Sequence, residues 1–349
     1  MTADPTPVSH GTAESEPITI SKIAEAAGVS VPTVSKVLNG RSDVAPQTRS
    51  RVEELISQHG YRRRRGPGSA RSATIDLLFH ELDSAWALEV IRGVERVARA
   101  ESLNVVLAES GGEQTPDDAW VDAVLARQST AAILVLSKLS LAQKERLSAR
   151  GIPFVVVDPT GDPGEDTPSI GATNWNGGLA ATRHLISLGH ERIAVIGGPK
   201  NMLCSRARID GYRSALDAAG LPTDPALIRT GDFHVEGGRD EGRRLLLLDD
   251  PPTAVFAGSD LQAMGLYEAA RELGMRIPDD LSVVGFDDLP VARWVGPPLT
   301  TVRQPLTEMA EEATRLALVL GRGERPGNLR LDLATDLVER QSTAPPRPR

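Results

Sequence analysis

Residues 18–39 read ITISKIAEAAGVSVPTVSKVLN, and this stretch decides the fold of the first part of the chain. The apolar residues of its first half recur at helical spacing and predict a short amphipathic helix over residues 21–27. Gly28 suits the left-handed turn that ends such a helix. Ser30 and Pro32 then suit the N-cap and the first turn of a second helix. Two short helices about a tight turn are typical of a helix-turn-helix unit that enters the DNA major groove, although an ordinary helical hairpin shares the local pattern.

The sequence that follows narrows this choice. Residues 41–61, RSDVAPQTRSRVEELISQHGY, predict a third helix after the Ala-Pro pair. The whole run resembles the headpiece of the LacI/GalR (lactose-repressor) family of bacterial transcription regulators. The family signature T-I-x-x-[IV]-A-x-x-A-G-V-S-x-x-T-V-S-x-V-L-N is matched from Thr19 to Asn39, with Lys22 where Asp is usual.

The resemblance implies which residues of the second helix contact DNA. Val31 and Pro32 fall at groove-facing positions and offer only apolar contacts, such as to a thymine methyl. Lys36 is the charged candidate for a guanine edge. The other DNA contacts implied by the matched positions are Thr19, Ser30, Thr33, Ser35 and Asn39, of which Thr33 and Ser35 match phosphate-contacting hydroxyls.

The charge is divided unevenly along the 349 residues. Residues 18–72 contain ten Lys and Arg against four Asp and Glu, a net charge of +6. Because the whole chain carries −8, the remainder carries −14. An acidic protein with one basic segment is typical of a local DNA-binding element, since counterion release needs positive charge only at the contact surface.

Composition also bears on the compartment. The chain has one cysteine, which excludes an internal disulfide framework and fits a reducing cytoplasm. No apolar run approaches the roughly 20 residues of a membrane span. Residues 1–17 are polar and acidic, without the pattern of a signal peptide, and predict a disordered lead. We therefore expect a cytoplasmic, nucleoid-associated protein.

A linker is predicted over residues 62–73. It begins with Arg62, Arg63, Arg64 and Arg65, which we expect to contact phosphates or the minor groove, although such a charge run is also typical of a solvated linker. In the resembling family this segment is a hinge helix of pattern Y-x-P-N-x-x-A-R-x-L, whose Leu enters the minor groove. Here the Asn and Leu are missing, and Gly-Pro-Gly at 66–68 interrupts any helix.

From residue 74 onward, short apolar runs alternate with amphipathic stretches, which predicts an α/β core of doubly wound parallel sheets. Its length favours two lobes: lobe 1 over about 74–172 plus 303–331, and lobe 2 over about 173–302 plus 332–340, followed by a disordered tail at 341–349. We expect residues 298–305, PLTTVRQP, to return the chain to the first lobe. Predicted strands lie at 75–79, 103–107, 132–136, 153–157, 193–196, 227–229, 254–257 and 281–285, with edge strands at 329–333 and 336–339. Predicted helices lie at 86–101, 116–127, 141–149, 175–187, 206–219, 235–248, 261–273 and 306–320.

The resemblance extends over this core. GHERIAVIGGP at 189–199, R-x-x-G-Y at 208–212, PDDLSVVGFDD at 278–288 and PPLTTVRQP at 297–305 are similar to family signatures. They imply a periplasmic-binding-protein fold, in which two lobes close on a small molecule, usually a sugar. The cleft residues implied by family position are Trp86, Asp158, Asn174, Arg208, Phe233, Ser259, Asp260 and Asp287. The alternatives are ordinary core packing for the two aromatics and turn capping for Asp287.

Motifs of catalysis are missing from the sequence. It has no G-x-x-x-x-G-K-[ST], H-E-x-x-H or G-x-S-x-G pattern and no cysteine pair, so we expect no enzyme activity, no metal and no cofactor. The predicted function is a homodimeric repressor of carbohydrate genes that binds a near-palindromic operator and responds to a sugar. The alternatives are a purine or other effector, a solute-binding protein, or a sugar-modifying enzyme.

Overall fold

The computed structural model describes residues 19–38, 44–58, 72–82, 85–112, 114–164 and 166–347. The chain forms two compact units, an N-terminal helical headpiece and an α/β core, and each is described by itself. The predicted lead at 1–17, Asn39 and the arginines at 62–65 lie outside the described residues.

The headpiece contains the three predicted helices, α1 (Ile20–Ala27), α2 (Val31–Leu38) and α3 (Pro46–Gln58). Gly28 ends α1 in the left-handed conformation, with φ of 68°, as the sequence predicts. The packed interior is small and built of aliphatic side chains. Its buried members are Ile23, Ala24, Ala27, Val34, Val37, Val44, Val52 and Ile56.

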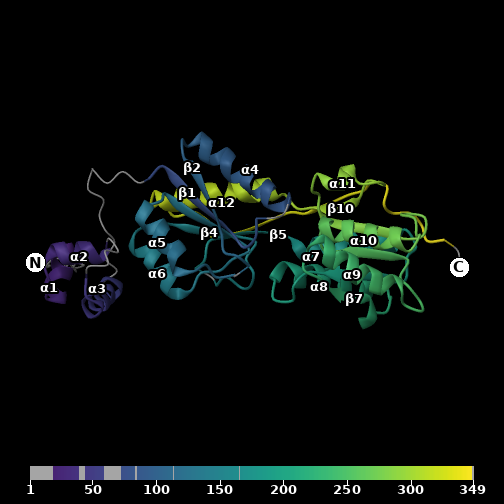
Figure 1. Ribbon diagram of the computed structural model, residues 1–349, viewed down its shortest axis with the longest axis horizontal. Helices are drawn as coiled ribbons and strands as arrows, with labels where there is room; N and C mark the ends of the chain where they lie inside the picture. The colour runs from purple at the N-terminus through teal and green to yellow at the C-terminus, as the bar shows by residue number, and fades with distance from the viewer. Residues whose placement is uncertain are drawn as a thin grey trace, which may run out of the picture. The chain divides into compact units, whose positions relative to one another are not determined.

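The first lobe of the core is a parallel sheet flanked by helices, with strand order β11-β5-β4-β3-β1-β2. Its strands are β1 (Thr74–Phe79), β2 (Asn104–Glu109), β3 (Ala131–Val135), β4 (Phe154–Val157), β5 (Ser169–Ala172) and β11 (Arg330–Leu333). Its helices are α4 (Ala85–Ala100), α5 (Asp118–Arg127), α6 (Leu141–Ala149) and α12 (Leu306–Gly321). The last of these comes from far along the chain and packs against α4, β3, β4 and β5 (Figure 1).

The second lobe repeats this plan, with strand order β12-β10-β9-β8-β6-β7. Its strands are β6 (Ile193–Gly197), β7 (Ile228–Thr230), β8 (Ala254–Ala257), β9 (Ser282–Asp287), β10 (Thr300–Arg303) and β12 (Asp336–Val338), the last antiparallel to β10. Its helices are α7 (Asn174–Ser187), α8 (Leu203–Ala218), α9 (Val235–Leu246), α10 (Asp260–Glu272) and α11 (Val291–Trp294), with a 3-10 turn at Pro225–Leu227. The predicted doubly wound, two-lobed architecture is confirmed.

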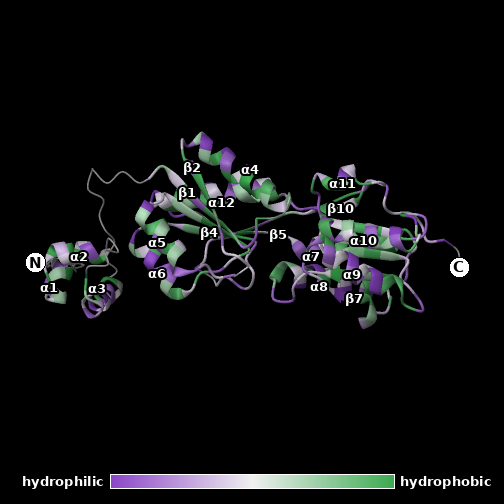
Figure 2. Cartoon of the chain, viewed as in Figure 1, coloured by the Kyte–Doolittle hydropathy of each residue, from purple (hydrophilic) through white to green (hydrophobic). Residues whose placement is uncertain are grey.

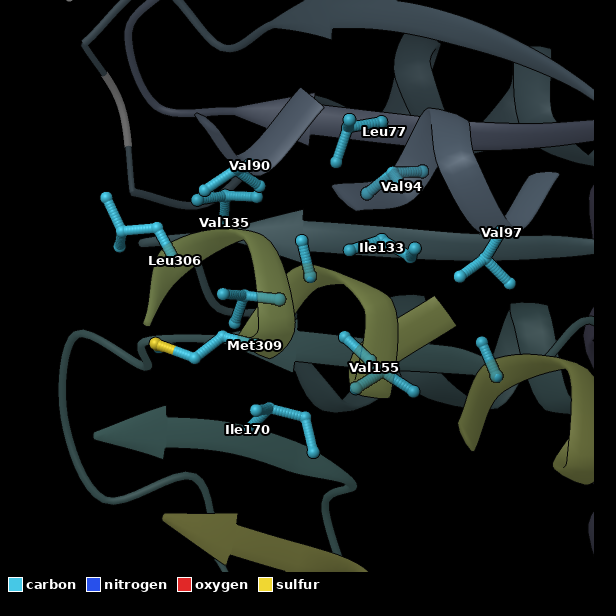
Figure 3. Packing of buried hydrophobic residues seen from close by; sticks show 14 of the residues in the cluster. Leu77, Val90, Val94, Val97, Ile133, Val135, Val155, Ile170, Leu306 and Met309 are labelled. Atoms are coloured by element: carbon cyan, nitrogen blue, oxygen red, sulfur yellow. The ribbon is translucent and has the colours of Figure 1, made fainter. Parts of the chain in front are cut away.

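Buried strands supply the apolar core of each lobe. Figure 2 shows hydrophobic residues along the strands of the sheets, whereas the surrounding helices carry both kinds of residue. In the first lobe, Leu306 and Met309 of α12 form one buried cluster with Val135, Val155 and Ile170 of the sheet (Figure 3). The core of this lobe therefore depends on a helix that the chain adds only after completing most of the second lobe.

Three details differ from the sequence prediction. The strand β5 was not predicted, because SIGA is short and contains a glycine; a Cβ on Gly171 would lie 2.5 Å from Asp332 Oδ1 of the neighbouring strand β11. Residues 300–303 of PLTTVRQP form β10 of the second sheet, so the chain returns to the first lobe only at 304–305. The predicted first lobe ends at residue 331, whereas strand β11 remains in the first sheet as far as Leu333.

The tail also differs from the expectation of disorder, through residue 347. The Ser342 hydroxyl donates to Val283 O at 2.6 Å and accepts from Thr300 N at 2.8 Å. The carbonyl of Ala344 accepts from Ser282 Oγ at 3.0 Å and lies 2.9 Å from His190 Nε2. These bonds fix the tail to the second sheet, because they satisfy polar groups that would otherwise be buried without partners.

Candidate DNA-binding surface and effector pocket

The second helix of the headpiece has one buried face and one open face. Val34 and Val37 are buried in the headpiece core. Val31, with 38% of its surface exposed, and the exposed Pro32 and Lys36 occupy the open side. The residues that the sequence predicts to contact bases thus lie on the side of the helix away from the headpiece core.

Two of the predicted hydroxyl contacts, Thr19 and Ser30, also cap helices. Ser30 Oγ accepts a hydrogen bond from Thr33 N at 3.3 Å and lies 2.8 Å from Thr33 Oγ1. Thr19 Oγ1 accepts from Lys22 N at 3.4 Å at the start of α1. Ser35 is half-buried. Capping places the hydroxyls of Thr19 and Ser30 at helix N-termini, where backbone N–H groups favour an anionic phosphate.

A cavity of about 370 Å³ lies between the two lobes of the core. Its lining comes largely from residues that follow the carboxyl ends of parallel strands, where doubly wound sheets bind ligands. The first lobe contributes Phe79, His80, Glu81, Trp86, Val135, Leu136 and Asp158. The second contributes Pro199, Met202, Cys204, Arg208, Asp232, Phe233, His234, Ser259, Leu261, Asp287 and Leu289.

Arg208 is the fixed centre of the polar side of this pocket. Its Nε donates to Asn174 Oδ1 at 2.8 Å, its Nη1 to Gly258 O at 2.5 Å and its Nη2 to Gln304 Oε1 at 3.0 Å. The guanidinium lies over the ring of Phe286, 3.6 Å from its centroid. Because each nitrogen has a partner and the plane is stacked, the guanidinium is held in one orientation before any ligand arrives.

Two buried carboxyls flank this guanidinium. Asp287 Oδ1 lies 3.8 Å from Arg208 Nη2, too far for a hydrogen bond, and is buried without a hydrogen-bond partner. Burial raises the pKa of Asp287 to about 7, against the lowering effect of Arg208. Burial also raises the pKa of Asp158, against the lowering effects of Arg208 and Gln304. An unpartnered buried carboxyl oxygen costs free energy, which a ligand hydroxyl would recover.

Left-handed backbone is concentrated at the pocket. Four residues of its lining are non-glycine residues with positive φ: Leu136 (49°), Asp158 (50°), Phe233 (72°) and Asp287 (112°). Such conformations are unfavourable for L-residues and persist where the surrounding structure imposes them, often at ligand sites. For Phe233 the neighbouring Gly198 is necessary, because a Cβ there would lie 2.1 Å from the ring.

A polar contact between the lobes crosses the rim of the pocket. His234 Nε2, at the N-cap of α9 in the second lobe, lies 3.1 Å from Glu81 Oε2 of the first lobe. A second link joins Leu203 N to Thr160 O at 2.9 Å. Both contacts join residues of the two lobes.

The structure divides the predicted effector residues into two groups. Trp86, Asp158, Arg208, Phe233, Ser259 and Asp287 line the pocket. Asn174 and Asp260 do not: Asn174 is buried behind the guanidinium, and Asp260 accepts from Leu289 N at 2.7 Å and Thr301 Oγ1 at 2.5 Å. Their oxygens are occupied by protein donors, which gives them a positioning role rather than a contact with ligand.

Comparison with known proteins agrees with this organisation. Residues 19–64 match the lacI family of bacterial regulatory proteins, and residues 182–343 match the periplasmic binding protein-like domain. The chain is 31% identical over 328 residues to the transcriptional repressor CytR of Escherichia coli, covering 93% of this chain and 96% of CytR. It is 35% identical over 334 residues to the regulator CelR of Thermobifida fusca, covering 93% and 98%. The chain belongs to the LacI family.

Solved structures of LacI-family regulators share the whole architecture. A CelR–cellobiose complex superposes with a TM-score of 0.71 at 34% identity, covering 93% of this chain and 99% of that chain. The lac repressor dimer bound to operator and an anti-inducer superposes with a TM-score of 0.68 at 26% identity, covering 94% and 100%. This LacI-family chain is therefore a DNA-binding transcriptional regulator and not an enzyme.

Two features are absent from the described part of this LacI-family chain. None of its helices is long and apolar enough to cross a membrane. Among the same residues, no group of three or more His, Cys, Asp and Glu is placed to hold a metal ion.

Much of the pocket lining was not predicted from the sequence. The additional residues are Phe79, His80, Glu81, Val135, Leu136, Pro199, Met202, Cys204, Asp232, His234, Leu261 and Leu289. A usable signal was present, because most of these lie at or just after the end of a predicted strand. Burial raises the pKa of the Cys204 thiol to about 12, so this side chain acts in the pocket as a small apolar surface.

Proposed function

We propose that this LacI-family regulator is a repressor whose operator affinity is controlled by a neutral carbohydrate bound between the lobes of its core. The observation that carries the proposal is the unpartnered, buried Oδ1 of Asp287 beside the fixed guanidinium of Arg208. Adjacent sugar hydroxyls both donate and accept, so one hydroxyl can serve the carboxyl while its neighbour serves the guanidinium. The rings of Trp86 and Phe233 suit the apolar faces of a pyranose.

The charge of the lining supports a neutral ligand. Glu81, Asp158, Asp232 and Asp287 all face the pocket, against one guanidinium. In a partly desolvated site this excess of carboxyl groups repels anions such as sugar phosphates and nucleotides. A neutral polyol avoids that repulsion and keeps every hydrogen bond.

The relatives support this effector class and a dimeric assembly. One structural neighbour is a complex with cellobiose, another is a lac repressor dimer on its operator, and a further relative is the ribose operon repressor of Escherichia coli, 33% identical over 334 residues. We propose that this chain also binds a near-palindromic operator as a homodimer, since one headpiece makes few base contacts and two half-sites multiply the effective affinity. Acting on the chromosome, it would be cytoplasmic and nucleoid-associated.

The mechanism that we propose couples the pocket to DNA through the angle between the lobes. A ligand that binds one lobe arrangement better shifts the population toward it, and the spacing of the two headpieces changes with it. The division into a headpiece (18–61), a linker (62–73) and a two-lobed core (74–340) belongs to this proposal.

Effector binding is tested on the full chain by thermal shift and calorimetry with glucose, galactose, xylose, ribose, cellobiose and maltose, alongside adenine and hypoxanthine. We expect at least one neutral sugar to bind and to change operator affinity. Binding of purines alone, or of none of the neutral sugars, would refute the proposed effector class.

Base readout is tested in the headpiece. Lys36→Ala is expected to lower specific affinity by roughly 1–3 kcal/mol and to relax preference at one base pair per half-site. The measurement is selection from a randomised half-site. Arg51→Ala is the matched control, because Arg51 is an exposed cation of α3 and its loss should weaken all sequences alike. An unchanged preference in Lys36→Ala would show that α2 does not contact bases as proposed.

The arginines at 62–65, outside the described residues, carry a separate proposal. Without the family's apolar wedge, we propose that this regulator bends its operator less and relies more on phosphate contacts. Replacing the four arginines with alanine should flatten the slope of log K against log salt by up to about 0.9 per lost phosphate contact in each subunit. A sharp kink in the bound duplex, with an unchanged salt slope, would contradict it.

A further inference from the structure

A second cavity, of about 440 Å³, adjoins the effector pocket. Three residues line both spaces, namely His80, Pro199 and Met202. The outer cavity is completed by Gly112, Gln114, Thr115, Lys138 and Asn201. Because the two cavities share these lining residues, a ligand longer than the inner pocket can extend directly into the outer cavity.

Both lobes contribute to this outer cavity. The first lobe supplies the turn after β2, with Gln114 and Thr115, and the segment after β3, with Lys138. These two segments are tied together, because Lys138 N donates to Gln114 O at 2.8 Å. The second lobe supplies Pro199, Asn201 and Met202 from the loop between β6 and α8.

The chemistry of the two cavities differs. The inner pocket has aromatic walls and an arginine with three of its five N–H groups already bonded to the protein. In the outer cavity, the side chains of Gln114, Thr115, Lys138 and Asn201 have no hydrogen-bond or ion-pair partner among the described residues. Their amide, hydroxyl and ammonium groups together offer donors and acceptors to hydroxyls, without an aromatic platform.

A polar atom at the junction between the cavities also lacks a hydrogen-bond partner. His80 Nδ1 is buried without a hydrogen-bond partner in the described structure. Gly112 N donates to His80 O at 3.2 Å and keeps the turn against this residue, with φ of 86°. A polar atom of a ligand that passes from one cavity to the other would lie next to this ring nitrogen, as a glycosidic oxygen or a neighbouring hydroxyl would.

We propose that the outer cavity is a second sugar subsite, so that the effector is an oligosaccharide of at least two units. This rests on the proposed carbohydrate function and narrows it. The inner unit stacks on the aromatic walls and bonds to Arg208 and Asp287, and the next unit takes hydrogen bonds from both lobes. A sugar phosphate is the competing ligand at the outer end, because the lining contains the cation Lys138 and no carboxyl, whereas the carboxyl of Glu81 lies in the inner pocket.

The experiment is calorimetric titration of the full chain with glucose, cellobiose, maltose and cellotriose, and with xylose and xylobiose, together with glucose 6-phosphate. We expect one disaccharide to bind roughly tenfold or more tightly than its own monosaccharide, as two or three extra hydrogen bonds predict. The double variant Gln114→Ala, Asn201→Ala should lower disaccharide affinity to that of the monosaccharide and leave monosaccharide affinity unchanged.

Lys200→Ala is the matched control, because Lys200 is exposed in the same loop as Asn201 but lines neither cavity. Equal affinity for mono- and disaccharides would overturn the second subsite while leaving the carbohydrate function in place. An equal loss for both ligands in the double variant would overturn it too, as would tighter binding of glucose 6-phosphate than of any disaccharide. Binding of none of the neutral sugars would overturn both proposals together.

Discussion

The two lobes of the core share one strand order but are built differently along the chain. The second lobe is nearly continuous in sequence, from α7 to β10. The first lobe takes β1 to β5 from residues 74–172 and then needs α12 and β11 from residues 306–333. The same topology therefore arises from one nearly complete segment in one case and from two distant segments in the other.

Their pocket walls differ as well. The first lobe supplies apolar and aromatic surface, with Phe79, Trp86 and Leu136, together with the carboxyls of Glu81 and Asp158. The second supplies the guanidinium of Arg208 and the unpartnered carboxyl of Asp287. A shared fold therefore fixes where a ligand binds, at the ends of the strands, while each lobe sets a separate part of the chemistry of binding.

The largest effect is expected for the polar wall. Arg208→Ala removes the cation from between two buried carboxyls and leaves Asn174 and Gln304 without their donor. We expect a loss of about 3–5 kcal/mol in the free energy of unfolding of the core, and loss of effector binding. Urea denaturation and calorimetry measure both. Arg206→Ala, at an exposed position of the same helix, is the control, and sugar affinity of wild-type strength in Arg208→Ala would disprove the assignment.

The next effect concerns the distant helix of the first lobe. Met309→Ala creates a cavity between α12 and the sheet (Figure 3), where Met309 is fully buried. We expect a loss of about 2–5 kcal/mol in stability with little change in sugar selectivity. Glu308→Gln, on the exposed side of α12, serves as control. If Met309→Ala were as stable as the wild type, the dependence of the first lobe on α12 would be wrong.

A smaller effect is expected on the pH dependence of sugar affinity, which should depend on the carboxyls and not on the aromatic wall. Because sugar hydroxyls donate to ionised Asp287, binding favours its charged form, and affinity falls as pH drops below its pKa of about 7 in the free protein. Between pH 7.5 and 5.5 we expect a decrease of roughly 10- to 30-fold. His80 and His234 also face the pocket, so Asp287→Asn is the necessary comparison. Its weaker binding, reduced by about 2–4 kcal/mol, should be nearly independent of pH over this range; an unaltered pH profile would assign the effect to the histidines.

The smallest effect is expected for the apolar wall. Trp86→Ala removes a stacking surface and should weaken sugar binding by about 1 kcal/mol, without changing its pH dependence. Trp86→Phe, which retains an aromatic ring, should recover most of the loss. Equal affinity in all three proteins, measured by calorimetry, would remove Trp86 from the binding surface.

The sequence predicted most of the architecture because periodicity is a local property. The three headpiece helices and the alternation of strands and helices were all visible in it. The strand β5 was not, since SIGA lacks a strong pattern and pairs with a strand more than 150 residues away. The fixed tail was missed for a similar reason, because the partners of Ser342 lie on distant strands.

The pocket was predictable only in part. Family resemblance located Arg208, Asp287, Trp86 and Phe233, which line the cavity. The resemblance also included Asp260, which does not line the cavity. Its carboxyl packs against Gly285, where a Cβ would lie 2.4 Å from Asp260 Oδ1. Whether a polar side chain faces a ligand or another strand depends on three-dimensional packing, which spacing along the chain does not encode.

The late arrival of α12 has a consequence for how the protein is made. The headpiece is complete once residue 58 has left the ribosome, and the second lobe lacks only its edge strand at residue 303. The strands of the first lobe are synthesised earlier, yet Val155 and Ile170 are covered only when α12 follows. At a synthesis rate of roughly 5–20 residues per second, this apolar sheet stays uncovered for on the order of ten seconds before its last helix is made. The lobe whose strands are translated first is therefore the lobe whose apolar core is closed last.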